Sequence, residues 1–401
     1  MKKIIVPLSL VIMLAFPACQ KDDATPTKTA ESSSAANAKP QSTFSADVIA
    51  RLDEFLQTQV YTEGANPKAT TPGVILLVDS PQGRYLQAAG VASLEDNTPI
   101  KTSDRVEIGS NSKSFTIVLL LQLQEAGILS LDDPLNKWLP GWAAKIPNGA
   151  AMTLRQLAQH TSGIWDYGDP IIGQAANNPV HLEDHHSPEQ LVQYALDNGT
   201  PDFAPGEKGQ WKYSNTGYIL LGMIIESASG KKLGDLYQSK IFDPLDLETA
   251  VFIEGVPEPD EIVDGYWWTE DDGHVLNTTK WNVSQGWAAG GIAMNAEDLL
   301  TYGKALSAGK LFQNPDSLAQ MLDFNPNGSG GLMPYGLGLI DFTVVGQSGF
   351  WGHEGQTAGF QTLWYTNPET KITVVGLSNS ASYSAFAFLK VADLLEAETS
   401  E

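Results

Sequence analysis

Strand-like segments cluster near both ends of this chain, and helical segments broken by proline and glycine lie between them. Near the N-terminal end, Gly73–Asp79 and Arg84–Val91 are short apolar runs separated by a Ser-Pro-Gln-Gly turn, which predicts a hairpin. Three segments near the C-terminal end also have the composition of strands: Tyr335–Val345, Gly359–Thr366 and Ile372–Leu377. Strands so far apart share one core most economically when both ends of the chain contribute to a single sheet.

Helical signatures surround and connect these strands. They occur at 46–60, 110–126, 154–159, 216–228, 296–308 and 381–395, and a second hairpin is expected around Glu-Asp-Asp-Gly at 270–273. The segment 110–126 is apolar on nearly every side, so we predict that this helix is buried. We therefore predict an α/β fold of the α+β type, an antiparallel sheet flanked by N- and C-terminal helices. The sheet part comprises about 44–128 and 291–397, and a mostly helical insert comprises about 129–290.

The charge balance excludes some classes of partner. The 401 residues include 24 Lys and Arg against 47 Asp and Glu, which gives a formal net charge of −23. Binding to phosphates requires clustered cations, and the sequence has no such cluster, so we expect no nucleic-acid partner. Hydrophobic residues make up 42% of the chain, enough for a sizeable core.

The single cysteine, Cys19, excludes an intrachain disulfide and a thiolate metal cage. It follows a Lys-Lys start, the apolar stretch Ile4–Phe16 and Ala18, which together are typical of a secretory signal. A unique cysteine at the cleavage point resembles the lipobox of bacterial lipoproteins, and an ordinary cleaved signal is the alternative. We expect residues 1–19 to be removed or lipidated at Cys19, residues 20–43 to be a flexible tether, and the protein to be a lipid-anchored component of the cell envelope, in the periplasm.

Ser110 and Lys113 form the first candidate catalytic pair. They are three residues apart at the start of the predicted buried helix, so their side chains lie on one face. A serine hydroxyl becomes a nucleophile when a base takes its proton, and a desolvated lysine can lose its own proton and act as that base. A Ser-x-x-Lys sequence occurs by chance in many helices with a solvent-facing lysine, but this helix is too apolar to face solvent.

The second candidate motif is Tyr-Ser-Asn at 213–215, just before an apolar helix. The phenol of Tyr213 can relay a proton if nearby cations lower its pKa, and the side chain of Asn215 can hold a substrate amide. Taken alone, the motif equally describes a helix-capping segment with a buried tyrosine.

The third candidate motif is His353-Glu354-Gly355 in the last part of the chain. His353 can provide a cation or a hydrogen-bond donor, and Gly355 allows a substrate to approach the backbone of the strand. Taken alone, His353 is more typical of a structural histidine whose ring nitrogens have hydrogen-bond partners.

In this order and spacing, the three motifs resemble the serine β-lactamase and penicillin-binding superfamily. The similarity is strongest to the branch with class C β-lactamases, serine-type D-alanyl-D-alanine carboxypeptidases and β-lactamase-like esterases. Three supporting segments are also similar to that branch: LDDPLNKWLP at 131–140, LRQLAQHTSGI at 154–164 and AGGIAMNAEDLLTYGKAL at 289–306. The resemblance covers about 45–396 and implies the β-lactamase/transpeptidase-like fold.

The resemblance implies a role for each catalytic residue. Ser110 is expected to be the acylated nucleophile, and Lys113 its base partner. Tyr213 is expected to shuttle the proton to the leaving group, and Asn215 to orient the substrate amide. No cofactor and no metal ion are expected to take part.

The resemblance also implies substrate-binding residues on the last strands. The backbone N–H groups of Ser110 and of Gln356, the residue after Gly355, are expected to form the oxyanion hole. His353 stands in place of the lysine of the Lys-Thr-Gly box in class C β-lactamases, as it does in carboxypeptidase and esterase members. Glu354 departs from the family, whose peptidases carry a hydroxyl residue there that helps to bind the substrate carboxylate. If the Glu354 carboxylate points inward, it repels such a substrate and favours an uncharged ester or an amine-bearing one.

The sequence HLEDHH at 181–186 is the remaining candidate for a metal site. On a helix, His181 and His185 share a face, but the sequence lacks the His-Glu-x-x-His arrangement of a metalloprotease. We expect an exposed loop without metal. His160 is expected to be a structural residue that bonds backbone near the cleft.

These observations favour a serine hydrolase with an acyl-enzyme intermediate that acts on D-alanyl-D-alanine-like peptides or related amides and esters. The expected partner is a small-molecule or peptide substrate of the peptidoglycan type, and the oligomeric state stays open. A carboxylesterase and a β-lactamase on the same fold are the alternatives, followed by a peptidoglycan- or penicillin-binding receptor that does not hydrolyse. An α/β-hydrolase is excluded because the sequence has no Gly-x-Ser-x-Gly motif.

Overall fold

A computed structural model describes residues 44–62, 65–66, 69–177, 181–258, 261–268 and 274–396. The expected signal with Cys19, the expected tether at 20–43 and the turn at 270–273 lie outside the described residues. The helices are α1 Ala46–Thr58, α2 Ser112–Glu125, α3 Leu135–Trp138, α4 Pro140–Lys145, α5 Leu154–Ala158, α6 Gly168–Asn177, α7 Pro188–Asn198, α8 Asn215–Ser229, α9 Leu233–Tyr237, α10 Trp287–Gly290, α11 Ala296–Ser307, α12 Pro315–Met321 and α13 Lys390–Glu396. The strands are β1 Gly73–Ser80, β2 Gly83–Gly90, β3 Val106–Glu107, β4 Val251–Phe252, β5 Tyr266–Trp268, β6 Val275–Asn277, β7 Ile292–Met294, β8 Ile340–Asp341, β9 Trp351–Gln356, β10 Gln361–Asn367 and β11 Ile372–Ser378.

Both ends of the chain meet in one antiparallel sheet. Its strand order is β2-β1-β11-β10-β9-β8, so the first hairpin pairs directly with the last strand. In that pairing, Ile75 of β1 lies opposite Leu377 of β11. Both strands are rich in Val, Ile and Leu, and residues on both of their faces are buried. The predicted fold class, an antiparallel sheet flanked by helices with a helical insert, is therefore confirmed.

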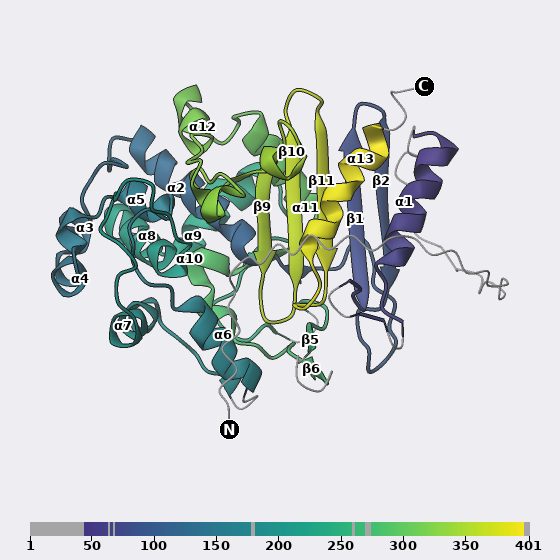
Figure 1. The fold of residues 1–401 in the computed structure, drawn as a ribbon, viewed down its shortest axis with the longest axis horizontal. Helices are drawn as coiled ribbons and strands as arrows, with labels where there is room; N and C mark the ends of the chain where they lie inside the picture. Colours follow the sequence, from purple (N-terminus) through teal and green to yellow (C-terminus); the bar gives the residue numbers. More distant parts are fainter. Residues whose placement is uncertain are drawn as a thin grey trace.

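Helices cover each face of this sheet (Figure 1). On one face, α1, α13 and the short helix η9 (Ala385–Leu389) pack their apolar sides on β1, β10 and β11. Val48 and Phe388 are fully buried there. On the other face, α11 packs against the same three strands, and Trp364 of β10 contacts Tyr302 of α11 edge to face. The sheet is thus a buried layer, and among the described strands only the two-residue β8 covers the outer side of β9.

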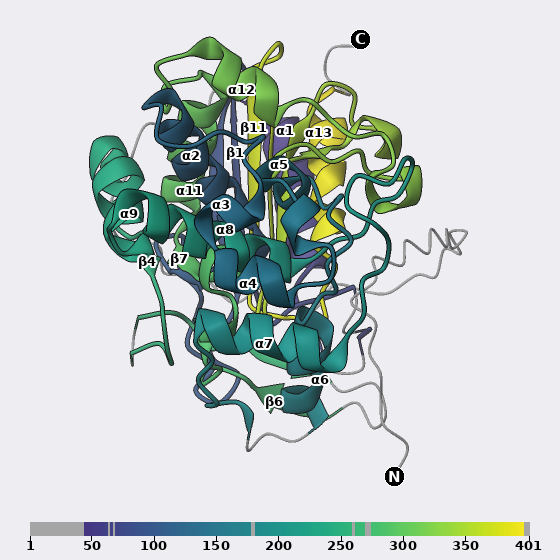
Figure 2. The same ribbon diagram turned by 90° about the vertical axis from the view of Figure 1, so that its left-hand side faces the viewer.

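The helical part lies beside the sheet, around α2 (Figures 1 and 2). Residues 112–121 of α2 are all buried, which confirms the prediction made from their apolar surroundings. The neighbours of α2 are α8 and α10, and α8 in turn packs against α5 and α7. This burial brings the N-terminus of α2 to the boundary between the helices and the sheet.

The prediction of a strand at Tyr335–Val345 is wrong for most of these residues. Only Ile340 and Asp341 pair as strand β8, and 343–345 is a single helical turn. Gly338 has φ +67°, and a side chain on Gly336 would meet the carbonyl oxygen of Met321 at 2.0 Å. The chain therefore turns tightly against α12 and α2 instead of running straight.

The last helical segment is also divided. The expected helix at 381–395 consists of η9 and α13, which follow one another at Leu389 and Lys390. Within the described residues, no helix has the length and apolar character to cross a membrane.

Candidate active site

Ser110 and Lys113 lie together at the start of α2. The short helix η1 (Gly109–Asn111) leads into α2, so both side chains project from one turn toward the sheet edge. Lys113 Nζ is 2.9 Å from Ser110 Oγ. The same Nζ donates to Asn215 Oδ1 at 2.7 Å and to the carbonyl oxygen of Ala289 at 2.8 Å. Two fixed acceptors thus orient the amine toward the serine.

The environment of Lys113 favours its neutral form. Burial lowers the pKa of the Lys113 ammonium from 10.5 to about 7, because the charged form loses its hydration. The negative charges of Asp166 and Glu354 oppose part of this shift. A neutral amine near pH 7 can donate to Asn215 and Ala289 and still offer its lone pair to the Ser110 proton.

Tyr213 reaches Ser110 from a segment 103 residues later in the chain. Its phenol donates to Ser110 Oγ at 2.7 Å. Burial and then the charge of Glu354 raise the pKa of Tyr213 well above 10. The idea that nearby cations lower this pKa is therefore wrong: the desolvated phenol stays protonated, and it acts as a donor.

Asn215 is the first residue of α8, and a carboxylate holds it in place. Asp166 Oδ1 accepts from the backbone N–H of Asn215 at 2.7 Å, and Oδ2 accepts from its side-chain amide at 3.3 Å. Because the amide nitrogen faces Asp166, the amide oxygen faces Lys113. Asp166 therefore determines which way the Asn215 side chain points.

His160 supports the same segment from behind, as the sequence led us to expect. Its Nδ1 accepts from the backbone N–H of Ser214 at 3.1 Å, so its proton is on Nε2. Its ring centroid is 4.4 Å from that of Tyr213. Burial, then the charges of Lys113 and His353, lower the pKa of His160 well below 6.5, so the ring is neutral.

His353 is buried on β9 and is also neutral. Burial lowers its pKa from 6.5 to about 3, and the charge of Lys113 acts in the same direction. Its Nδ1 donates to the carbonyl oxygen of Glu354, and its Nε2 accepts from the Tyr335 hydroxyl at 2.9 Å. Of the two expected roles of His353, the cation is therefore wrong, whereas the ring does act as a hydrogen-bond donor, to the Glu354 carbonyl oxygen.

Two glycines allow β9 to touch η1 directly. A Cβ on Gly355 would lie 1.9 Å from the carbonyl oxygen of Ile108, and one on Gly109, whose φ is +53°, would lie 2.7 Å from the backbone nitrogen of Gln356. The peptide of Gln356 therefore lies against the residue before Ser110. This close approach places the two expected oxyanion-hole donors, the N–H groups of Ser110 and Gln356, beside one another.

Glu354 separates His353 from Gly355 on β9 and remains partly accessible to solvent. Its charge acts on Lys113, Tyr213 and Tyr335, so its carboxylate lies near the nucleophile. Burial raises the pKa of Glu354 from 4.5 to about 7, against the attraction of Lys113. Glu354, the residue at which this chain departs from the family pattern, therefore lies in the candidate active site.

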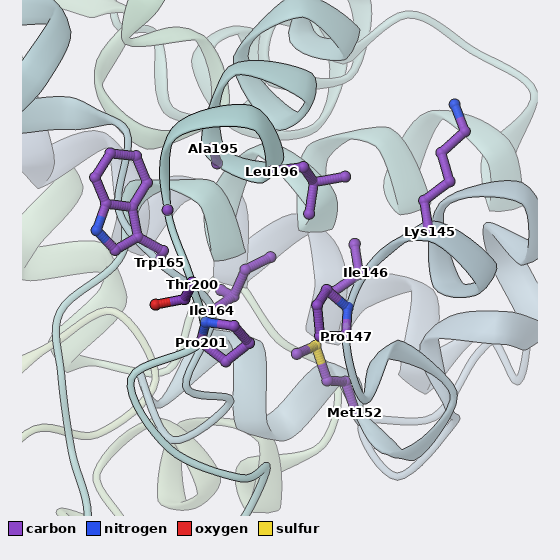
Figure 3. A pocket seen from close by; sticks show the side chains of 11 residues that line it. Lys145, Ile146, Pro147, Met152, Ile164, Trp165, Ala195, Leu196, Thr200 and Pro201 are labelled. Atoms are coloured by element: carbon purple, nitrogen blue, oxygen red, sulfur yellow. The ribbon is translucent and has the colours of Figure 1, made fainter.

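The other sequence candidates lie elsewhere. His181 is exposed and pairs with Asp184 at 2.7 Å, and the described residues contain no group of three potential ligands that could hold a metal ion. A separate apolar cavity in the helical part is lined by Lys145, Ile146, Pro147, Met152, Ile164, Trp165, Ala195, Leu196, Gly199, Thr200 and Pro201 (Figure 3). One of these residues, Trp165, also contacts the first turn of α8, where its carbonyl accepts from Thr216 Oγ1 at 2.7 Å.

Sequence analysis missed three groups of the site. Asp166 follows the segment LRQLAQHTSGI, and Ala289 is the first residue of AGGIAMNAEDLLTYGKAL. Both segments are similar to the family, but the sequence predicts no role for these two residues. Tyr335 was assigned to a strand. The position of Asp166 two residues after the first segment was the one available signal for it.

The arrangement of the Ser110 hydroxyl with the Lys113 amine, the Tyr213 phenol and the adjoining backbone of β9 is that of the serine β-lactamases and penicillin-binding proteins. The chain belongs to the beta-lactamase family, whose sequence profile matches residues 49–398. The superfamily predicted from the three motifs is thereby confirmed.

Individual relatives are consistent with this assignment. A penicillin-binding protein of Bacillus subtilis is 27% identical over 352 residues, which cover 85% of this chain and 75% of the relative. A D-aminopeptidase of Cereibacter sphaeroides is 28% identical over 328 residues, but the match covers only 59% of that longer protein. The crystal structure of a D-stereospecific amidohydrolase from Streptomyces sp. is 30% identical with a TM-score of 0.72, and the match covers 84% of this chain and 97% of that one.

Proposed function

We propose that this protein is a serine amidohydrolase that cleaves amide or peptide bonds through an acyl-enzyme on Ser110. The observation that carries the proposal is the convergence on Ser110 Oγ of the Tyr213 hydroxyl at 2.7 Å and of Lys113 Nζ at 2.9 Å. One neighbour is suited to accept a proton and the other to donate one, which is what amide cleavage requires.

Acylation begins with neutral Lys113. Its lone pair takes the Ser110 proton while Oγ forms a bond to the substrate carbonyl carbon, and the N–H groups of Ser110 and Gln356 stabilise the oxyanion. The carbon–nitrogen bond then breaks as Tyr213 gives its phenolic proton to the departing nitrogen. The proton held by Lys113 replaces it, and the amine leaves with the acyl ester on Ser110.

Deacylation reverses the proton movements with water in place of the amine. Lys113 takes a proton from water as the water oxygen attacks the ester carbon. The bond from that carbon to Ser110 Oγ breaks, Oγ regains a proton, and the carboxylic acid leaves. Asn215, held by Asp166, has one amide hydrogen left to donate to a substrate amide oxygen.

The proposed substrates carry a D-configured residue on the acyl side of the bond, and D-alanyl-D-alanine-like peptides are among them. Support comes from the relatives, one a D-aminopeptidase and one a D-stereospecific amidohydrolase. An esterase or a β-lactamase would use the same nucleophile, and the low pKa of His353 removes the cation that would bind the carboxylate of a β-lactam.

A side-by-side assay tests the proposal. D-alaninamide, L-alaninamide, a peptide ending in D-Ala-D-Ala, nitrocefin and p-nitrophenyl butyrate are compared with purified protein. We expect turnover of a D-configured amide or peptide at least tenfold above that of L-alaninamide. Turnover of the ester alone would favour a carboxylesterase, and turnover of nitrocefin alone a β-lactamase.

The variant Ser110→Ala tests the nucleophile. We expect it to lose turnover and labelling by a fluorophosphonate while its circular dichroism stays that of the wild type, because only one oxygen atom is removed. Mass spectrometry of the labelled wild type should place the adduct on Ser110. Absence of an adduct in the wild type would favour a receptor that does not hydrolyse.

For the location of the protein, we propose export to the cell envelope and lipid attachment at Cys19. Support comes from the signal-like sequence at 1–19 and its unique cysteine. Metabolic labelling with a radioactive fatty acid is expected to mark the wild type and not Cys19→Ala. Release of unlabelled wild type into the soluble envelope fraction would contradict the lipid anchor.

A further inference from the structure

Among the described residues, the carboxylates of Asp166 and Glu354 lie near Ser110, and of these two only Asp166 has hydrogen-bond partners. Asp166 accepts from the backbone and the side chain of Asn215 and from the backbone N–H of Gly168. For Glu354, the described residues supply no hydrogen bond to the carboxylate; only the charge of Lys113 opposes its desolvation. A partly buried carboxylate without donors is costly to keep ionised. Such a group is well suited to accept a positively charged donor from a ligand.

Lys113 does not neutralise Glu354 by direct contact. All the hydrogen bonds of Nζ go to Ser110, Asn215 and Ala289, and no ion pair with Glu354 is among those of the described residues. The two imidazoles of the site are neutral, because burial lowers the pKa of both His160 and His353. Above pH 7, where Lys113 is neutral, the Glu354 carboxyl, whose pKa is also about 7, is ionised, so Glu354 and Asp166 give the site a negative charge.

Glu354 lies where a bound substrate passes. Strand β8 pairs with β9 only at Trp351 and Gly352, so from His353 onward the described strands of this sheet flank β9 on the β10 side alone. Glu354 is two residues before Gln356, which corresponds to about 7 Å along a strand. A substrate whose carbonyl oxygen points at the N–H of Gln356 therefore has its adjoining amino group within reach of the Glu354 side chain.

Building on the proposed function, we propose that Glu354 binds a positively charged amino group of the substrate, so that the preferred substrates are amides or peptides with a free ammonium next to the scissile carbonyl. A substrate that ends in a carboxylate meets repulsion from the same group. This selects aminopeptidase-like and amino acid amidase-like reactions over carboxypeptidase reactions at one and the same nucleophile.

Binding to a variant that cannot turn over isolates this step. The affinity of Ser110→Ala for D-alaninamide and for N-acetyl-D-alaninamide is measured by calorimetry at pH 7.5, and the measurement is repeated with Glu354→Gln added. We expect the free amine to bind at least tenfold more tightly, and Glu354→Gln to reduce this preference to about threefold or less. Glu354→Asp keeps the charge and should retain part of the preference. The matched control, Glu369→Gln on the exposed turn between β10 and β11, should leave it unchanged.

The outcomes separate the two proposals. Equal affinity for the two amides, no measurable binding of either, or a preference that survives Glu354→Gln overturns the role of Glu354. Turnover of any D-configured amide by the wild type would then still support the amidohydrolase. A preference that depends on Glu354 in a protein whose wild type hydrolyses no amide supports the ammonium site and contradicts the proposed function.

Discussion

At the scale of single residues, the proposed reaction depends on whether Lys113 is free to accept the proton of Ser110. Lys113 has three acceptors around it, and two of them, Asn215 and Ala289, cannot return a proton. The third, Ser110, has a proton to give. In the proposed mechanism, Lys113 can take this proton only when it is neutral, and burial among the apolar surroundings of α2 favours its neutral form.

The activity is expected to fall as the pH drops below about 7. The pKa of Lys113 in the folded protein is lowered to about 7, so the neutral base predominates above this pH and is protonated below it. The value of kcat/KM for a neutral amide should fall by about tenfold per pH unit on the acid side. A pH profile from 5 to 9 measures it.

The control for this profile is Lys113→Arg, whose guanidinium stays protonated and should be inactive at every pH. A flat profile for the wild type down to pH 5 would exclude Lys113 as the base.

Asp166 is a positioning residue that acts through Asn215. Asp166→Asn is expected to lower kcat by about tenfold, because the Asn215 amide loses its charged partner. It should also move the acid limb of the pH profile to lower pH, since the negative charge that raises the Lys113 pKa is gone. A purely structural role would lower the stability without moving the limb. The exposed Asp316→Asn is the control and should change neither.

At the scale of elements, the contact between β9 and η1 sets the relative position of the two backbone N–H groups that we propose as the oxyanion hole. Gly355→Ala forces a Cβ to within 1.9 Å of the Ile108 carbonyl oxygen. We expect a loss of about 1–3 kcal/mol in the free energy of unfolding together with most of the activity. Urea unfolding and kcat measure the two effects.

A second strand glycine provides the matched control. Gly376→Ala on β11, two strands away from β9, places a Cβ 2.2 Å from the Phe388 ring, on the face of the sheet that η9 covers. It should cost similar stability and leave kcat of the folded protein near the wild-type value. Equal activity in both variants would show that the β9–η1 contact is not needed for the reaction.

The segments 110–126 and 335–345 show what the local sequence pattern can and cannot predict about helices and strands. The first was predicted as a buried helix because its apolar residues encircle the axis, and it forms α2. The second has the composition of a strand but turns at Gly336 and Gly338 to fit against α12 and α2. Composition cannot reveal that fit, because the surfaces involved come from other parts of the chain.

At the scale of the whole molecule, the fold needs both ends of the chain. The C-terminal segment after β11 supplies Tyr383, Phe388 and Val391 to the face of the sheet that α1 also covers. A chain comprising residues 44–396 is expected to unfold cooperatively and to be active, whereas one comprising 44–379 should not fold, because that apolar face is then open to water. Thermal circular dichroism compares the two. Cooperative unfolding of the shorter chain would contradict a single shared core.

Sequence alone was sufficient for the superfamily, because the three motifs in their order and spacing resemble it. It was also sufficient for the sheet built from both ends and for the pairing of Ser110 with Lys113, because strand composition and helical spacing are local properties. Tertiary structure decided the charge states of Tyr213 and His353, the partnership of Asp166 with Asn215, and a Glu354 carboxylate to which the described part of the chain donates no hydrogen bond. These depend on desolvation and on contacts between segments tens to hundreds of residues apart, and the pKa of a side chain follows from the dielectric and the partners that the folded chain places around it.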